Sequence, residues 1–167
     1  MNLEKRIYIY YFGLCLSSIT FRNLNNLSVS FKVYVYKFPE EYMAKFVANI
    51  MNETMSNENF RKVLATNKFS QLVVMALQPG ENIGMEVHTD VDQFIRIEQG
   101  TGQAILDGEV SNISDDFAVV IPAGTEHDII NTSDTKLMKL YTIYSPAEHP
   151  DGVVFRTKAE AEAAHHA

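Results

Sequence analysis

The segment "GMEVHTDVDQF", residues 84–94, combines one histidine with acidic and amide side chains at spacings that suit a metal site. Glu86 and His88 are two residues apart, so a β-strand would direct both side chains to the same face. The turn after His88 reverses the chain, and Gln93 begins the returning strand on the face that Ile95 shares. Nitrogen and oxygen groups that converge in this way can bind a divalent metal ion.

A second segment, "IPAGTEHDIIN", residues 121–131, supplies another histidine, His127, directly after a Pro-Gly turn. Two imidazoles, one carboxylate and one amide would complete a site with two nitrogen and two oxygen ligands. The single cysteine, Cys15, excludes a disulfide framework and a thiolate zinc cluster. The predicted metal ligands are Glu86, His88, Gln93 and His127.

Both segments resemble the two motifs of the cupin superfamily. The first motif is Gly, five residues, His-x-His, three or four residues, Glu, six residues and Gly. Its spacing is matched by Gly80, Glu86-x-His88, Gln93 and Gly100. The second motif is Gly, five residues, Pro-x-Gly, two residues, His, three residues and Asn. Its spacing is matched by Asp116, Pro122-x-Gly124, His127 and Asn131.

Three positions depart from the cupin pattern. Glu86 replaces the first histidine, Gln93 replaces the glutamate, and Asp116 replaces a glycine, a change that Asp tolerates because it adopts left-handed dihedrals more readily than most residues. The first two exchanges together retain one carboxylate. His88, His127 and Glu86, with Gln93 as a weaker neutral ligand, would suit Mn, Fe, Ni or Zn. Gln93 could instead hydrogen-bond the substrate or a metal-bound water.

The resemblance covers residues 60–146 and implies an all-β double-stranded β-helix, the cupin jelly-roll barrel, of six to eight strands with the metal in the barrel mouth. The sequence agrees, because short apolar strands alternate with turn residues throughout this part. We expect one antiparallel pair from segments 85–88 and 93–100, and a second from 117–124 and 127–133.

Two further local signals specify a hairpin and a helix. Asp107-Gly108 is a dipeptide typical of two-residue hairpin turns. The alanine-rich residues 157–166 predict a short C-terminal helix with Thr157 as its N-cap.

Composition divides the chain near residue 42. Residues 1–42 hold ten of the 18 aromatic side chains and a charge of +2, whereas residues 43–167 carry a charge of −9. We interpret 43–167 as the cupin domain and 1–42 as an N-terminal extension. The extension could be a weak signal peptide, an added edge strand within residues 27–38, or translated upstream sequence with the native start at Met43, which we favour.

Charge and hydropathy restrict the partners. A net charge of −7 without a basic stripe argues against nucleic-acid binding. The apolar run near the N-terminus is too short and too polar to span a bilayer, so we expect a cytoplasmic protein without membrane contact. The exposed face that carries Phe94 and Arg96 would allow a homodimer.

The predicted pocket above the metal is apolar and suits a small molecule. Its expected lining residues are Met75, Ile95, Ile97, Val119, Ile121 and Ile129. The scarcity of cations counts against phosphorylated substrates; those considered are Arg61, Lys62, Lys68 and Arg96.

The function that we predict is metal-assisted isomerisation or tautomerisation of a small carbohydrate or sugar-acid-like molecule. The alternatives are a non-catalytic cupin that binds metal or a small ligand, and a cupin dioxygenase. No catalytic residue is assigned, although the candidate bases are Glu86, if it is not a ligand, and an unplaced carboxylate such as Glu126 or Asp128. We expect His149 on the surface, unless the loop after the last strand folds over the barrel mouth.

Overall fold

The structure is a computed structural model that describes residues 19–22, 28–31 and 45–165. The chain divides into two compact units, residues 1–38 and 39–167. In the first unit, β1 (Ile19–Arg22) and β2 (Ser28–Phe31) form an antiparallel pair. β2 lies inside the predicted strand 27–38, whose remaining residues are outside the described part, as are residue 42 and the predicted start at Met43.

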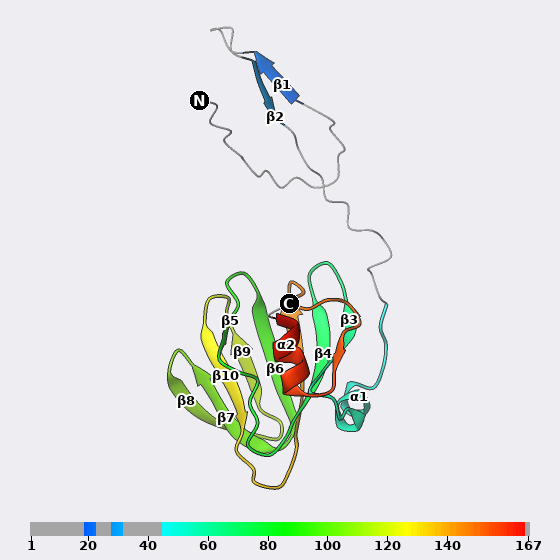
Figure 1. The fold of residues 1–167 in the computed structure, drawn as a ribbon, viewed down its shortest axis with the longest axis vertical. Helices are drawn as coiled ribbons and strands as arrows, with labels where there is room; N and C mark the ends of the chain where they lie inside the picture. Colours follow the sequence, from blue (N-terminus) through cyan, green and yellow to red (C-terminus); the bar gives the residue numbers. More distant parts are fainter. Residues whose placement is uncertain (1–18, 23–27, 32–44, 166–167) are drawn as a thin grey trace. The chain divides into compact units, whose positions relative to one another are not determined.

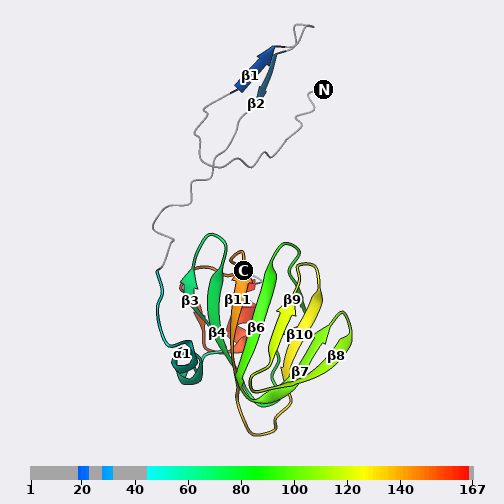
Figure 2. The ribbon, with the colours of Figure 1, turned by 180° about the vertical axis from the view of Figure 1, so that it is seen from behind.

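The second unit contains two antiparallel sheets and two short helices (Figure 1). In spatial order, the larger sheet is β12 (Val154–Phe155), β3 (Arg61–Thr66), β4 (Gln71–Leu77), β11 (Met138–Ser145), β6 (Asp92–Gln99) and β9 (Ala118–Ile121). The smaller sheet is β5 (Glu86–Val87), β10 (Glu126–Asn131), β7 (Thr101–Leu106) and β8 (Glu109–Ser114). Figure 2 shows β3, β4, β11, β6 and β9 side by side.

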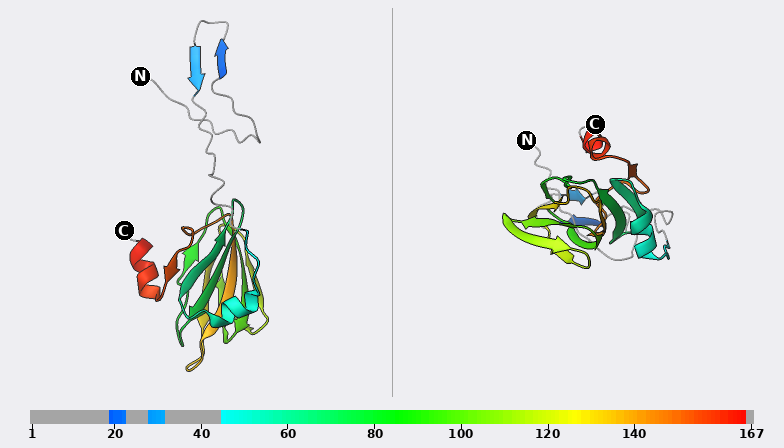
Figure 3. Two further views of the ribbon diagram at one scale, coloured as in Figure 1. Left: turned by 90° about the vertical axis from the view of Figure 1, so that its right-hand side faces the viewer. Right: turned by 90° about the horizontal axis from the view of Figure 1, so that it is seen from below.

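This all-β double-stranded β-helix is the predicted fold. The described part of the second unit has ten strands, more than the six to eight expected, and two of the ten, β5 and β12, contain only two residues each. The expected C-terminal helix is α2 (Lys158–His165), where the hydroxyl of Thr157 accepts a hydrogen bond from Glu160 N at 3.2 Å. α2 lies on the outside of the sheets in both views of Figure 3.

A second helix, α1 (Ile50–Ser56), was not expected from the sequence. Its seven residues are too few to display a helical apolar period, and a cap is its clearest local signal. The side chain of Asn49 accepts a hydrogen bond from Asn52 N at 3.1 Å, which satisfies one of the free N–H groups of the first turn.

The core lies between the two sheets. Strand alternation directs one set of apolar side chains inward, and every residue expected to line the barrel is at most 7% exposed. These residues are Met75, Ile95, Ile97, Val119, Ile121 and Ile129.

The observed turn conformations agree with the sequence signals better than the observed strand pairing does. Asp107 and Gly108 both have positive φ, 48° and 82°, as the two-residue hairpin between β7 and β8 requires. Asp116 adopts φ 71°, so the aspartate in the motif's glycine position takes the left-handed conformation that glycine would provide.

The pairs predicted for 85–88 with 93–100 and for 117–124 with 127–133 were wrong. β5 pairs with β10, whereas β6 pairs with β11 and β9, so the turn after His88 carries the chain from one sheet to the other. β9 and β10 are likewise separated between the sheets by the Pro-Gly turn. Short turns favour pairing of neighbouring strands, but in a jelly roll the facing sheet offers an equally close apolar surface. β10 therefore becomes the direct neighbour of β5.

Candidate metal centre

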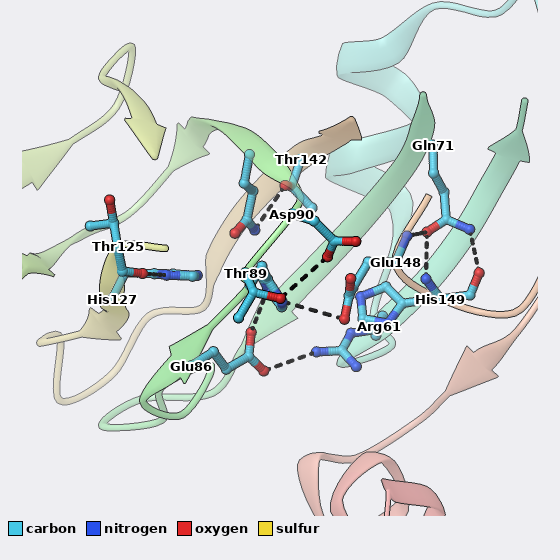
Figure 4. A network of polar contacts seen from close by, with 12 residues as sticks. Arg61, Gln71, Glu86, Thr89, Asp90, Thr125, His127, Thr142, Glu148 and His149 are labelled. Carbon is cyan, nitrogen blue, oxygen red and sulfur yellow. Dashed lines mark hydrogen bonds and ion pairs between the residues drawn. The ribbon is translucent and has the colours of Figure 1, made fainter. Parts of the chain in front are cut away.

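Three of the four predicted ligands come together at one end of the β5–β10 pair. The potential ligand atoms of Glu86, His88 and His127 all lie within 4.8 Å of one another. The strand register places Glu86 directly opposite His127, and alternation directs His88 to the same face as Glu86. We call these three residues the triad; Figure 4 shows Glu86 and His127 in their surroundings.

The surroundings fix the orientation of both imidazole rings. Nδ1 of His127 lies 2.9 Å from the backbone carbonyl of Thr125, which can only accept a hydrogen bond. Nδ1 of His88 lies 3.3 Å from Oε1 of Glu148, a second acceptor. Each contact favours the proton on Nδ1 and leaves the lone pair of Nε2 available, which is the arrangement found in metal-binding histidines.

Both Nε2 atoms are buried, and neither forms a hydrogen bond with any described residue. Nε2 of His88 lies 3.4 Å from Oε2 of Glu86. Two ligand atoms about 2.1 Å from one ion are separated by about 3.0–3.4 Å when they subtend a right or tetrahedral angle. The donor set therefore fits a divalent metal ion, both in its chemistry and in this separation.

The fourth predicted ligand, Gln93, is buried on β6 but is tied to a different partner. Its side chain is 2% exposed, and Nε2 donates a hydrogen bond to Oγ1 of Thr142 at 3.1 Å. Its Oε1 has no hydrogen-bond partner among the described residues. Gln93 can thus present a carbonyl oxygen, and its roles as metal ligand or as substrate contact both stay predictions.

The loop after β11 folds over this end of the barrel, so the expected surface position of His149 was wrong. His149 is 8% exposed, and its ring packs edge-on against Tyr144 with centroids 4.9 Å apart. The ring of Tyr144 in turn lies 5.8 Å from that of His88. The same loop positions Glu148, a residue near the triad that sequence reasoning missed because it belongs to neither motif.

Gln71 holds this loop in place. Its Oε1 accepts hydrogen bonds from the backbone N–H groups of Glu148, at 3.3 Å, and His149, at 2.9 Å. Its Nε2 donates to the carbonyl of His149 at 2.7 Å and to Oγ1 of Thr66 at 2.9 Å. The carboxylate beside His88 is therefore positioned by a buried amide on β4 (Figure 4).

Replacing Gln71 with leucine should release the loop and weaken metal binding. The loss of the four hydrogen bonds would leave buried backbone groups unsatisfied and cost about 2–4 kcal/mol of stability. With Glu148 no longer fixed, the affinity for metal should fall about tenfold, the lower end for loss of an outer partner. Isothermal titration with Zn(II) measures this change. The exposed Gln78 provides the control, Gln78→Leu, and equal affinities in the two variants would contradict the assignment.

Arg61 is a second residue whose place the sequence analysis did not identify. The sequence suggested it only as one of four cations that a phosphorylated substrate could contact. In the structure its side chain is 2% exposed, and Nη2 lies 3.7 Å from Oε1 of Glu86. The signal was present in the alternation of β3, which puts Arg61 on the same face as the buried Val63. The triad therefore has a buried guanidinium beside it.

These contacts shift the pKa values of two triad residues. Burial would raise the pKa of Glu86, but the close approach of His88 Nε2, 3.4 Å away, and the positive charges of Arg61, His88 and His127 outweigh it and lower the pKa. The close contact with the Glu86 carboxylate raises the pKa of His88, against the effect of burial, and the charge of Glu148 adds to the rise. Burial also raises the pKa of Tyr144, so its hydroxyl stays protonated near the triad.

Two of the three candidate bases, Glu126 and Asp128, point away from the triad. Glu126 and Asp128 flank His127 on β10, so alternation directs both to the opposite face. Asp128 accepts hydrogen bonds from Asn82 Nδ2, at 2.5 Å, and from Gly84 N, at 3.2 Å. The suggestion that either residue is a base was therefore wrong, and Glu148 is the carboxylate that lies beside His88.

Other polar residues of the two motifs have structural roles. Asn131 is fully buried and donates to the carbonyls of Leu77, Gln78 and Lys136. Asp92 is exposed and accepts a hydrogen bond from the backbone N–H of Ala123. Arg96 faces outward, where it pairs with Glu98 and Asp116.

Two surface hollows, of about 360 and 300 Å³, lie along β7, β8 and β9, and no triad residue lines either. The buried donor atoms, not the size of a hollow, therefore identify the candidate site. In the described residues, no helix has the length and hydropathy needed to cross a membrane.

Comparison with known proteins places the chain in a family. The family model described as "Cupin domain" matches residues 73–144. "Uncharacterized protein YrkC" of Bacillus subtilis (strain 168) is 49% identical over 125 residues, which cover 71% of this chain and 67% of that protein. "Uncharacterized protein L612" of Acanthamoeba polyphaga mimivirus is 46% identical over 112 residues, which cover 65% and 70% of the two chains.

The crystal structure of BH2720 from Bacillus halodurans is similar to this fold, with a TM-score of 0.69 and 41% identity over 72% of this chain and 95% of that one. The crystal structure of TT1209 from Thermus thermophilus, at 18% identity and a TM-score of 0.54 over 60% of this chain and 96% of that one, shares the fold. The double-stranded β-helix, the two motifs and these relatives agree: the chain belongs to the cupin family, of the cupin 2 conserved barrel type.

Proposed function

We propose that this cupin holds one divalent metal ion through Glu86, His88 and His127, with Oε1 of Gln93 as a weaker fourth ligand. The metal site then serves the isomerisation or tautomerisation of a small carbohydrate or sugar-acid-like molecule. The observation that carries the proposal is that both histidines have Nδ1 engaged by an acceptor and Nε2 buried without a hydrogen-bond partner among the described residues.

A metal ion in this position supplies Lewis acidity, which polarises a carbonyl or hydroxyl group of a bound molecule. The protein's own groups would handle the protons. Glu148, whose side chain is 30% exposed, is a carboxylate that can accept a proton at the mouth of the site. The hydroxyl of Tyr144, kept protonated by burial, can donate a hydrogen bond to a developing negative charge.

The proposal is tested with protein purified without a histidine tag. Metal content is measured first, and the protein is then loaded separately with Mn(II), Fe(II), Ni(II) and Zn(II). Each form is incubated with uronates and ketoses in D2O, and NMR follows both product formation and deuterium incorporation, which proton transfer at carbon requires. Oxygen consumption by the Fe(II) form is recorded in parallel.

Glu86→Gln should lose metal and turnover together, because it removes the one carboxylate of the triad. Glu126→Gln is the matched control, since Glu126 is exposed on the opposite face of the adjacent strand. Metal binding without turnover would indicate a non-catalytic cupin that binds metal or a small ligand. Oxygen consumption coupled to substrate loss would identify a dioxygenase. Wild-type protein that takes up none of the four metals would refute the metal centre itself.

Above pH 6.5, the contribution of the triad to stability should fall with rising pH in the metal-free protein and increase with rising pH when metal is added. Without metal, the raised pKa of His88 stabilises the protein fully below 6.5, and this contribution is lost as the pH rises through the folded-state pKa. The lowered pKa of Glu86 stabilises it fully above 4.5, and this contribution is lost as the pH falls through the folded-state pKa. The contribution of this pair in the metal-free protein should therefore be largest between pH 4.5 and 6.5.

Metal binding requires His88 without a proton on Nε2, so the metal competes with the proton that Glu86 favours. Stabilisation by added metal should grow as the pH rises above 6.5, by about tenfold in apparent affinity per pH unit for each proton displaced, until His88 is neutral. Melting temperatures with and without Zn(II), measured from pH 5 to 9, test this. Parallel curves for the two forms would contradict it.

A further inference from the structure

Arg61 occupies a position that strands normally give to apolar side chains. β3 alternates between core-facing and half-buried residues, and Arg61 takes the first core-facing position, opposite Met75 of β4. It is among the largest fully buried side chains of the described residues. Its guanidinium carbon lies 5.7 Å from the ring centre of Phe60, and Figure 4 shows the group directed toward Glu86.

The guanidinium is only partly satisfied by the protein. Its Nε and Nη1 are buried and form no hydrogen bond with any described residue, and Nη2 reaches Glu86 only at 3.7 Å, longer than a hydrogen bond. A buried charged donor without an acceptor is strongly destabilising. Such a group is retained at a binding site when a ligand supplies the missing acceptor.

Two other basic side chains, Arg96 and Lys139, have acceptors within the protein. Arg96 pairs with Glu98 and Asp116 on the outer face. Lys139 donates to the backbone carbonyl of Asn57. Arg61 therefore combines burial, proximity to the triad and unused donors in a way that neither Arg96 nor Lys139 does.

The charges around the triad indicate what the acceptor is. A divalent ion and Arg61 would contribute three positive charges, and Glu86 and Glu148 two negative ones, with His88 and His127 neutral as ligands. One positive charge is left over in a site that is mostly removed from water, where an unbalanced charge is costly. A ligand with a single negative charge would balance it, whereas a phosphate dianion would leave one negative charge.

We propose that Arg61 binds the carboxylate of the molecule that this cupin takes at its metal site, so that the ligand is a small monocarboxylic acid. The planar guanidinium matches a carboxylate in shape and donates charge-assisted hydrogen bonds to it. This inference rests on the proposed function and narrows its substrate class from carbohydrates in general to carboxylates. Arg61 is then a specificity-determining residue that holds the substrate while the triad holds the metal.

The experiment measures binding of paired probes to the Zn(II)-loaded protein by calorimetry and by ligand-observed NMR. Acetate is compared with acetamide, D-glucuronate with D-glucose, and inorganic phosphate serves as the dianionic anion. We expect at least one carboxylate to bind at least about tenfold more tightly than its neutral partner and than phosphate. Arg61→Met, which keeps the volume and removes the charge, should abolish this preference and retain the bound zinc.

If Arg61→Met does not fold, Arg61→Lys replaces it, and a loss of at least about threefold in carboxylate preference is expected because lysine lacks the planar fork. The inference is overturned if no carboxylate is preferred, if phosphate binds most tightly, or if the folded variant keeps the wild-type preference. Zinc content separates the two proposals. Retained zinc without carboxylate preference refutes only the role of Arg61, whereas an Arg61-dependent preference in protein that binds no metal refutes only the metal centre.

Discussion

His127→Leu is expected to abolish metal-induced stabilisation without lowering the stability of the metal-free protein. His127 is 1% exposed, and its buried Nε2 has no hydrogen-bond partner among the described residues. Leucine loses the hydrogen bond from Nδ1 to the Thr125 carbonyl, but it also removes the unsatisfied Nε2 and fills a similar volume, so the free energy of unfolding without metal should stay within about 1 kcal/mol of wild type. A purely structural histidine would show the opposite pattern.

Wild-type protein at a metal concentration one hundred times Kd should gain about 2.7 kcal/mol in unfolding free energy, and His127→Leu should gain none. Chemical denaturation with and without Zn(II) measures both quantities. His149→Leu is the control, because His149 is also buried but lies outside the triad, and it should keep the gain. A gain of wild-type size in His127→Leu would mean that the metal is held elsewhere.

Gly102→Ala is expected to destabilise the barrel by about 3 kcal/mol or more, the largest effect of a single methyl group that we predict. Gly102 lies on β7 between Asn131 of β10 and Ile113 of β8. A Cβ at this position would collide with the backbone carbonyl oxygen of Ile130 and would lie 2.5 Å from Cε of Met138. The methionine can move, but the carbonyl belongs to the neighbouring strand, so β7 and β10 would have to separate.

The comparison variant is Gly80→Ala. Gly80 has φ +74°, which alanine adopts at a cost of about 1–2 kcal/mol, but a Cβ there meets no atom within 4 Å. Urea denaturation of the two metal-free variants should therefore rank Gly102→Ala as clearly less stable. Equal losses would show that β10 accommodates the added methyl group and that the close approach does not require glycine at position 102.

The distortion should also reach the triad. β10 carries His127 opposite Glu86, so a shift of this strand changes the distance between two triad residues. Gly102→Ala should consequently bind metal more weakly even at temperatures where it is folded. Gly80→Ala should bind with wild-type affinity.

Features that depend on local spacing could be predicted from the order of the residues. A separation of two residues puts Glu86 and His88 on one face of any strand, whatever that strand pairs with. The Asp107-Gly108 hairpin, the left-handed Asp116 and the cap at Thr157 follow from the dihedral preferences of single residues, and the structure has all of them. The motif spacings that resemble cupins were sufficient to predict the fold.

The tertiary structure alone decided which strands pair and which distant residues complete the site. β5 pairs with β10 and not with β6, because a short turn can lead equally well to the facing sheet. Glu148 reaches His88 only because Gln71, 78 residues before His149, holds the loop. Arg61 reaches Glu86 although β3 belongs to the larger sheet and β5 to the smaller one. Periodicity reports which face a side chain occupies, whereas these contacts depend on how two sheets stack, an arrangement that short stretches of sequence do not encode.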